Sequence, residues 1–160
     1  VYLKCRCIMK QCYDRKSNKL LFTDANGITF DFQMRGMKTI VHGDSATGKS
    51  LLCTRLREIQ NDYNQNDVLK KYNADNIVVA DKNWLNEIEN LNSKLIVIDR
   101  ADIVLTEEIK ECIKNDCSNV YLLFMRGPIG LNISPNYYAH LVREDNTIRL
   151  EYEFNVGEWF

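Results

Sequence analysis

Residues 38–50 read Lys-Thr-Ile-Val-His-Gly-Asp-Ser-Ala-Thr-Gly-Lys-Ser, and this stretch decides which fold the sequence predicts. Residues 38–41 are typical of a short strand, and apolar side chains near helical spacing over residues 49–60 predict a helix. Between them, residues 43–50 match Gly-x-x-x-x-Gly-Lys-Ser, the pattern of loops that bind phosphate groups. A strand, such a loop and a helix in this order indicate an α/β domain with an anion site at the loop.

The residue types of the loop explain why it would hold phosphate. Gly43 and Gly48 permit backbone angles that let successive N–H groups turn toward an oxyanion, and the helix N-terminus adds partial positive charge. Lys49 can reach the β- and γ-phosphates of a nucleotide, and the Ser50 hydroxyl can ligate Mg²⁺. The residues expected to bind the nucleotide are Gly43, Asp44, Ser45, Ala46, Thr47, Gly48, Lys49, Ser50 and Leu51.

Three continuous apolar runs follow the loop and predict buried strands. They are residues 77–80, 95–98 and 120–125, and an uninterrupted apolar run is typical of a strand buried on both faces. Residues 83–91 and 105–116 have the character of helices. Buried strands that alternate with helices predict a three-layer α/β fold, in which a mostly parallel sheet carries helices on both faces.

Antiparallel strands are expected at the two ends of the chain. Residues 28–33 alternate apolar and polar side chains, as a half-buried strand does. Residues 138–143 and 147–154 flank the pair Asp145-Asn146, which is a hairpin signal.

A carboxylate follows the second of the apolar runs. Asp99 comes directly after residues 95–98, so it should emerge at the carboxyl edge of the sheet, where ligands bind in open α/β sheets. A carboxylate in this place holds Mg²⁺ through water. We therefore expect Ser50 and Asp99 to be the protein ligands of a magnesium ion. A helix cap or a surface position is the alternative for Asp99.

With the loop at 43–50 and Asp99, the chain resembles the P-loop ATPases of the additional-strand class, the group that contains the ABC, AAA+ and RecA-like ATPases. A strand at 77–80 intervenes between the P-loop strand and the strand before Asp99, and a further one at 120–125 follows. The antiparallel pair before the loop and the final hairpin are most similar to an ABC-type core. The resemblance covers residues 28–154 and implies a three-layer P-loop fold that binds ATP and Mg²⁺.

The sequence also departs from this family. No Leu-Ser-Gly-Gly-Gln segment lies between the two motifs, and the chain is too short for the ABC helical subdomain, so a transporter ATPase is disfavoured. The family often carries a glutamate directly after the aspartate of its second motif, and this chain has Arg100 instead. An arginine cannot act as a base at accessible pH, so hydrolysis needs another carboxylate or is very slow.

Two carboxylates could orient the attacking water, and the sequence does not decide between them. A third possibility is that no carboxylate is dedicated to this role. Asp81 follows the first apolar run, where RecA-like ATPases carry a catalytic glutamate, and Asp102 could face the site or cap the next helix. Arg126 ends the last run, where these ATPases place a polar residue that senses the γ-phosphate, although a plain surface role is the alternative. The residues given catalytic roles are Lys49, Asp81 and Arg126.

Composition and charge limit the partners. The net charge is −1 and no basic block is present, so a nucleic-acid partner is not favoured. No stretch approaches the ~20 apolar residues of a membrane span, and the N-terminus shows no secretory signal. The six cysteines lack metal-site spacing and are expected to be free thiols of a cytoplasmic protein. A chain of 160 residues has room for one domain, expected over residues 1–160 with its core at 28–154.

The function that this sequence predicts is ATP binding with slow Mg²⁺-dependent hydrolysis, acting as a switch on a protein partner or through self-association. A small-molecule kinase is one alternative, but residues 60–76 and 126–136 offer too few arginines for a phosphate-covering lid. A GTPase would need an Asn-Lys-x-Asp motif, which is missing. A nucleotide-dependent interaction module without turnover is the third alternative, and Arg100 favours it. His42 and His140 are expected to be structural, because no nucleophile or ligand set accompanies them.

Overall fold

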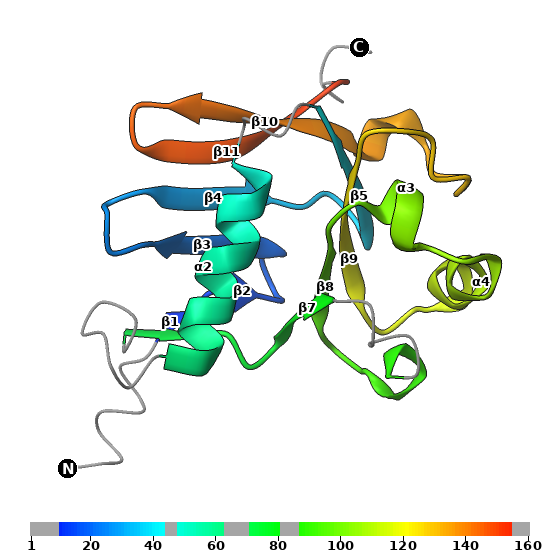
Figure 1. The fold of residues 1–160 in the computed structure, drawn as a ribbon, viewed down its shortest axis with the longest axis horizontal. Helices are drawn as coiled ribbons and strands as arrows, with labels where there is room; N and C mark the ends of the chain where they lie inside the picture. The colour runs from blue at the N-terminus through cyan, green and yellow to red at the C-terminus, as the bar shows by residue number, and fades with distance from the viewer. Residues whose placement is uncertain (1–9, 44–47, 63–70, 81–86, 155–160) are drawn as a thin grey trace.

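Strands dominate the computed structural model, which describes residues 10–43, 48–62, 71–80 and 87–154. Nine strands form one mixed sheet in the order β2-β3-β4-β11-β10-β5-β9-β8-β7 (Figure 1). Their bounds are β2 Tyr13–Asp14, β3 Lys19–Thr23, β4 Thr29–Gln33, β5 Lys38–His42, β7 Ile77–Ala80, β8 Leu95–Ile98, β9 Val120–Met125, β10 Tyr138–Glu144 and β11 Thr147–Tyr152. A separate two-stranded ladder pairs β1 Lys10–Gln11 with β6 Tyr72–Asn73.

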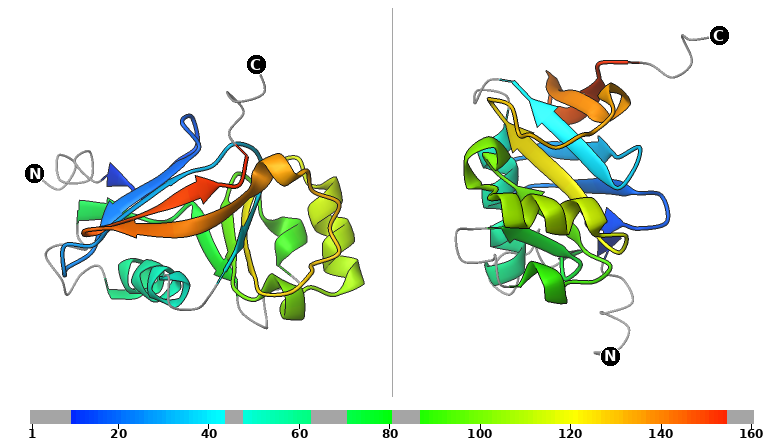
Figure 2. Two further views of the ribbon diagram at one scale, coloured as in Figure 1. Left: turned by 90° about the horizontal axis from the view of Figure 1, so that it is seen from above. Right: turned by 90° about the vertical axis from the view of Figure 1, so that its right-hand side faces the viewer.

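Helices are few in the described part of the chain. The α-helices are α2 Lys49–Asp62, the single turn α3 Ala101–Val104, and α4 Glu107–Asn115, and two short 3₁₀ helices are η4 Ile88–Asn90 and η5 Pro135–Tyr137. Seen from above, α2 lies on one side of strands β5, β9 and β8, whereas α3 and α4 lie on the other side (Figure 2).

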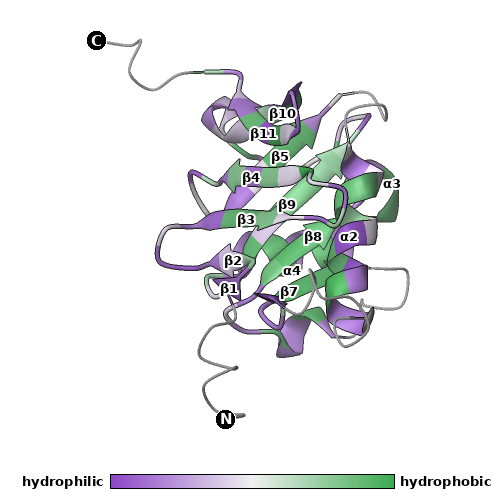
Figure 3. Cartoon of the chain, turned by 90° about the vertical axis from the view of Figure 1, so that its left-hand side faces the viewer, coloured by the Kyte–Doolittle hydropathy of each residue, from purple (hydrophilic) through white to green (hydrophobic). Residues whose placement is uncertain are grey.

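Four neighbouring strands, β5, β9, β8 and β7, run parallel to one another. Successive side chains of these strands enter two different cores: Val97 and Leu122 pack in the core that contains α2, while Ile98 and Leu123 pack in the core that contains α3 and α4. All four side chains of β8 are buried, because both faces of this part of the sheet are covered. The apolar colour in Figure 3 follows these same strands.

The other five strands pair in a mixed pattern. β2, β3 and β4 are antiparallel, β4 is parallel to β11, and the β10–β11 hairpin connects β4 to β5 within the sheet. Leu20, Phe22 and Phe30 point into the core that contains α2. On the opposite face of the same strands, Lys19 and Asp31 form a partly exposed ion pair of 3.2 Å. The face of these strands that carries Lys19 and Asp31 is therefore largely polar and meets solvent.

The two edges of the nine-stranded sheet approach each other. Asn76, the residue before β7, donates from Nδ2 to the carbonyl oxygen of Tyr13 in β2 at 2.8 Å. Next to it, the backbone N–H of Cys12 donates to the carbonyl oxygen of Asn73 at 2.9 Å. The β1–β6 ladder lies at this seam, so the sheet curls into a nearly closed, barrel-like wall.

The expected fold class is wrong. A three-layer P-loop fold with a mostly parallel sheet and helices on both faces was predicted, but the structure is a mixed, nearly closed nine-stranded sheet with few helices. The physical reason lies in the terminal segments, whose alternating side chains leave one face polar. They do not remain at the ends of the sheet: the hairpin enters between β4 and β5, and five of the nine strands thereby belong to the mixed part.

Several local predictions are nevertheless confirmed. The strands expected at 77–80, 95–98 and 120–125 coincide with β7, β8 and β9, and the hairpin turns at Asp145 and Asn146. The helices expected at 49–60 and 105–116 correspond to α2 and α4. Of the helix expected at 83–91, residues 83–86 lie outside the described residues, and the described residues 87–91 hold only the short 3₁₀ helix η4. None of the helices in the described ranges combines the length and apolar character that a membrane crossing requires.

Candidate functional site

The carboxyl ends of β5, β8 and β9 meet at one edge of the sheet. The register places His42 of β5 opposite Met125 of β9, and Ile98 of β8 opposite Leu123 of β9. Residues that follow these three strand ends therefore come together at the same edge, as the strand order β5-β9-β8 requires. They are Gly43, Asp99 and Arg126, three of the residues singled out from the sequence.

Both glycines of the loop adopt backbone angles that side chains rarely adopt. Gly43 has φ +128° and Gly48 has φ +110°. A Cβ atom at Gly48 would also lie 2.9 Å from the Cδ1 atom of Ile148 in β11, which is too close without movement. Residues 44–47, which were expected to bind nucleotide, lie outside the described residues. The described ends of the loop therefore have the glycine geometry that the pattern predicts.

Lys49 joins the two ends of this loop. It is the first residue of α2 and is buried, with 3% of its surface exposed. Its Nζ atom donates to the carbonyl oxygen of Gly43 at 2.7 Å. Burial lowers the pKa of Lys49, the charge of Arg126 lowers it further, and the charge of Asp99 opposes both. A buried ammonium beside other cations favours any anion that could take the place of the carbonyl as its acceptor.

The first turn of α2 presents backbone donors next to Lys49. The N–H of Leu52 donates to the Gly48 carbonyl at 3.0 Å, so the N–H groups of Lys49, Ser50 and Leu51 precede this first helical bond. Such groups at the start of a 14-residue helix are suited to bind an anion. The Ser50 side chain is exposed, whereas Leu51 packs against the core, so Leu51 can contribute only its backbone.

Asp99, the residue after β8, lies near enough to α2 for its charge to act on residues of that helix. Its charge raises the pKa of Lys49 against the effect of burial. Burial raises the pKa of Cys53, on the next turn of α2, to about 11, and Asp99 is the second cause of that shift. Ser50 and Asp99 offer the oxygen donors that Mg²⁺ prefers, and this ion typically needs only one or two protein ligands beside phosphate and water. By residue type, Ser50 and Asp99 suit the expected metal, and their role as its ligands remains a prediction.

Arg100 and Asp102 form a bidentate pair directly after Asp99. The Nε of Arg100 donates to Oδ1 of Asp102 at 3.2 Å, and its second terminal nitrogen donates to Oδ2 at 3.1 Å. The N–H of Gly127 donates to the same Oδ2 at 3.1 Å. The hydrogen bond from Arg100 lowers the pKa of Asp102, against the effect of burial. This carboxylate is thus engaged by protein groups, which removes the support for Asp102 as the water-orienting residue.

Asp102 does not cap the following helix either. The N-cap of α4 is Thr106, whose hydroxyl oxygen accepts from the N–H of Ile109 at 3.4 Å. Arg126 is exposed and follows β9, which lies between β5 and β8 in the sheet. Asp81 lies outside the described residues, and the register shows only that the residue before it, Ala80, pairs with Ile98. The catalytic roles given to Lys49, Asp81 and Arg126 remain predictions.

Glu153 contacts both His42 and His140, and the sequence did not predict this. Its Oε1 atom lies 2.8 Å from Nε2 of His42 and 2.8 Å from Nδ1 of His140. The hydrogen bond with His140 lowers the pKa of Glu153, while burial opposes this and His42 adds to it. The two histidines thus fasten the end of β5 to the final hairpin. Only the pairing of β5 with β10 and of β10 with β11 brings these residues together.

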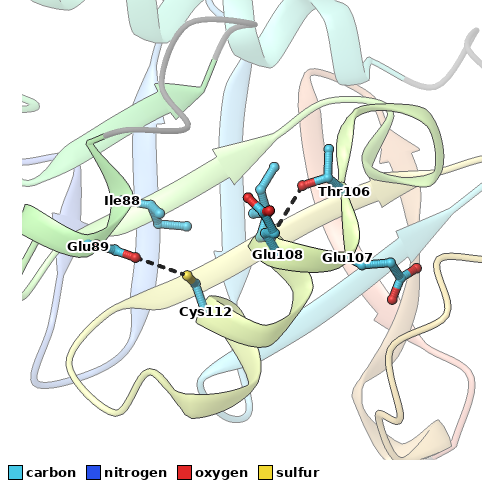
Figure 4. Close-up of a pocket in the computed structure, with 7 residues that line it drawn as sticks. Ile88, Glu89, Thr106, Glu107, Glu108 and Cys112 are labelled. Carbon is cyan, nitrogen blue, oxygen red and sulfur yellow. Dashed lines mark hydrogen bonds between the residues drawn. The ribbon is translucent and has the colours of Figure 1, made fainter.

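A cavity of about 600 Å³ lies elsewhere, between η4 and α4 (Figure 4). Glu89, Glu107 and Glu108 line it, together with Cys112, whose Sγ donates to Oε1 of Glu89 at 3.7 Å. No lysine or arginine is among its lining residues, so the cavity does not suit a phosphate group. In the part of the chain that the structure describes, no three His, Cys, Asp or Glu side chains are placed to hold a metal ion by themselves.

A scan against models of protein families finds no match, and a search of curated proteins finds no similar sequence. The function must therefore be argued from the loop, the buried lysine and the charges around them.

Proposed function

We propose that the chain binds a nucleoside triphosphate, ATP with Mg²⁺, through residues 43–50. The observation that carries this proposal is the buried Lys49, whose ammonium spans the loop to the carbonyl oxygen of Gly43. Burial of an ammonium is costly unless a partner compensates it, and the acceptor that the described residues supply is one neutral carbonyl, which compensates it only partly. A phosphate placed between the loop and α2 would bring further negative charge next to this ammonium.

The surrounding residues favour a ligand with several phosphate groups. The charges that act on Lys49 include Arg126 and Arg100 as well as Asp99 and Asp102. In the proposed complex, backbone N–H groups at the start of α2 bind phosphate oxygens, and Lys49 neutralises the β- and γ-phosphates. Ser50 and Asp99 would hold the magnesium ion, which when bound neutralises charge on the phosphates. These residues bind and orient the ligand.

We further propose slow hydrolysis and a switch that acts on a protein partner. Arg100 occupies the position after Asp99, and a guanidinium cannot accept a proton from water at accessible pH. Turnover then depends on Asp81, or is absent. The same Arg100 supports the second candidate function, a nucleotide-dependent interaction module without turnover. Single-turnover hydrolysis by the purified protein distinguishes the two functions.

The proposed binding is tested by thermal unfolding with and without Mg-ATP. A ligand at one hundred times its dissociation constant adds about 2.7 kcal/mol to the free energy of unfolding, which corresponds to a Tm increase of roughly 5–10 °C. Lys49→Ala should remove most of this increase. The matched control is Lys38→Ala, at the opposite end of the strand β5, which should keep it. Absence of any shift with millimolar ATP or GTP would contradict the proposed function.

A further inference from the structure

A second concave surface lies on the side of the sheet that carries α4, opposite α2 (Figure 2). The cavity of about 600 Å³ between η4 and α4 (Figure 4) adjoins a smaller one of about 270 Å³, and Ile88, Glu89 and Cys112 line both. Together the two cavities extend from Thr106, the N-cap of α4, to Asp116, its C-cap. We call them the η4–α4 groove.

Apolar side chains from both elements line this groove. Ile88 of η4 and Ile109 of α4 line the larger cavity and belong to the core that contains α3 and α4. Leu91, directly after η4, and Tyr121 of β9 line the smaller cavity. Because close packing in the core fixes these side chains, the apolar lining is already formed before any ligand arrives. It suits aliphatic groups, whereas an unpaired polar group would be costly to bury there.

Carboxylates from the same two elements accompany the apolar lining. Glu89 of η4 and Glu107 and Glu108 of α4 line the larger cavity, and all three are exposed. Glu107 forms an ion pair of 3.2 Å with Lys110. Glu89 accepts from the Cys112 thiol at 3.7 Å, and no lysine or arginine among the described residues pairs with Glu89 or Glu108. The groove therefore carries negative charge that the described part of the chain does not neutralise.

Three carboxylates act on the thiol of Cys112, inside the groove. Burial raises the pKa of Cys112, and the charges of Glu89, Glu108 and Asp116 raise it further. Carboxylates from η4, from α4 and from its C-cap therefore face a common space. A concave surface lined by one sign of charge concentrates its potential and attracts the opposite charge. The groove thus favours a cation, and its apolar lining favours a cation with an aliphatic body.

We propose that the η4–α4 groove is a docking site for a basic segment of a partner protein, whose lysine or arginine side chains pack their aliphatic stems against Ile88 and Ile109 and place their charged ends beside Glu89 and Glu108. Long basic side chains bury their stems along apolar surfaces in this way while the charged end stays at the rim. This docking does not involve the loop at 43–50, so it goes beyond the proposed function.

The length of the groove suits a short extended segment. α4 has nine residues and is therefore about 14 Å long, a distance that about four extended residues span. Side chains at alternate positions of an extended segment point to the same side. Two basic residues separated by one other residue can therefore enter the groove together.

The experiment measures the binding of fluorescein-labelled peptides by fluorescence anisotropy, without nucleotide. The salt concentration is about 150 mM, which screens long-range attraction between exposed charges. The probe has the sequence Lys-Leu-Lys-Leu-Lys. Two control peptides replace its lysines: glutamine removes the charge, and 2,4-diaminobutyrate keeps the charge on a shorter stem. The second control distinguishes packing of the stem from charge alone.

Three proteins are compared: the wild type, a groove variant with Glu89→Gln and Glu108→Gln, and a matched control variant with Glu87→Gln and Glu111→Gln. Glu87 is the N-cap of η4, Glu111 belongs to α4, and neither is among the residues that line the groove. The two variants therefore lose the same charge from the same part of the molecule. Glutamine keeps the size of the side chain, and thermal unfolding verifies that both variants are folded.

We expect the lysine peptide to bind the wild type and the control variant with dissociation constants within twofold of each other, and the groove variant at least fivefold more weakly. Both control peptides should bind the wild type at least fivefold more weakly than the lysine peptide does. Equal weakening in the two variants, or equal binding of the two cationic peptides, would overturn the proposal, because charge alone would then explain binding. Absence of binding to the wild type would overturn it too.

Two other occupants are tested alongside. Displacement of the lysine peptide by spermidine at a lower concentration than unlabelled peptide requires would assign the groove to a small polyamine. A wild-type dimer in analytical ultracentrifugation that the groove variant loses would assign it to a second copy of this chain. Either result would overturn the proposal. Since none of these measurements involves nucleotide, their failure leaves the proposed function untouched.

Discussion

Asp24 and Arg55 form an ion pair that joins the β3–β4 turn to α2: Oδ2 of Asp24 lies 2.9 Å from Nε of the partly exposed Arg55. The carboxylate is completely buried, and its other oxygen accepts the N–H groups of Asn26 and Ile28 at 2.9 and 2.8 Å. The pair thus connects the mixed part of the sheet to the helix that begins at the phosphate-binding loop. Stability of this part of the molecule and geometry of the loop should be linked.

Removal of the Asp24 carboxylate should be strongly destabilising. Asp24→Ala would leave two backbone donors without their acceptor and would leave Arg55 with Glu58 as its carboxylate partner. A buried donor left unsatisfied costs about 1–3 kcal/mol. The partly exposed pair between Lys19 and Asp31 provides the control, because Asp31→Ala should cost about 1 kcal/mol or less. Urea unfolding measures both values. If the two variants lose similar free energies of unfolding, the Asp24–Arg55 pair contributes no more to stability than the Lys19–Asp31 pair does.

The pH dependence of stability should reveal Asp116. Burial would raise the pKa of this carboxyl, but hydrogen bonds from Tyr121, Ser118 and Asn119 outweigh burial and lower it to about 2. A carboxyl whose folded pKa lies below its unfolded pKa stabilises the fold above the unfolded value, near 3.8, and loses that contribution as pH falls toward 2. Asp116→Asn should therefore reduce stability at pH 6, with a difference that shrinks below about pH 4. A difference that grows on acidification would contradict the assignment. Urea midpoints at several pH values measure it.

Ser50 should govern the magnesium requirement rather than nucleotide binding itself. Its exposed hydroxyl in the first turn of α2 is the proposed metal ligand, whereas the backbone donors of the turn do not depend on the side chain. Ser50→Ala should keep metal-free ATP binding and lose the additional thermal shift that Mg²⁺ gives. Thr54→Ala, also exposed and one turn later in the same helix, is the control. A variant Ser50→Ala that still responds fully to Mg²⁺ would exclude the hydroxyl as a ligand.

The base of the nucleotide should be adenine. The Asn-Lys-x-Asp motif that reads guanine is missing from the sequence, so the loop is expected to work without a guanine-specific contact. Competition against a fluorescent ATP analogue should show weaker displacement by GTP than by ATP. Equal or better displacement by GTP would show that this expectation is wrong.

Asp81 is the remaining carboxylate proposed to orient water. Loss of a general base typically lowers a rate by about 10²–10⁴, so Asp81→Asn should reduce ATP hydrolysis at least tenfold and change ATP affinity only a few fold. Asp75→Asn, in the turn before the same strand, is the control and should hydrolyse at the wild-type rate. Hydrolysis by Asp81→Asn at the wild-type rate would refute its role. No turnover by any of these proteins would favour the interaction module.

Local patterns in the sequence were enough to predict the strands after the loop. β8 and β9 are continuous apolar runs because both of their faces are covered, and this cause acts within the strand itself. The sheet as a whole could not be predicted in the same way. The pairing of Phe30 with Ile148 joins β4 to β11, which are far apart in the chain. The residues of one strand do not indicate that the other is its neighbour. The sequence therefore predicted the antiparallel strands of the chain ends at the edges of the sheet, whereas they form five of its nine strands.

The candidate site divides in the same manner. The glycines and Lys49 follow from a contiguous pattern, and the structure gives Gly43 and Gly48 the positive φ angles that this pattern needs. The bond between Arg100 and Asp102 depends on a left-handed arginine, which no residue-type preference predicts. The bridge from Glu153 to the histidines depends on strand register. Contacts of these two kinds became visible only with the fold.

The position of the β10–β11 hairpin has a consequence for the newly made chain. β4 and β5 follow each other in sequence, yet the hairpin separates them in the finished sheet. While the ribosome has not yet released residues 138–152, both strands have an open edge and no permanent neighbour on that side. They can pair with each other or with another nascent chain during this interval. Residues 138–152 are synthesised after both strands and lie between them in the sheet, so folding includes an insertion into the middle of the sheet that displaces any such early pairing.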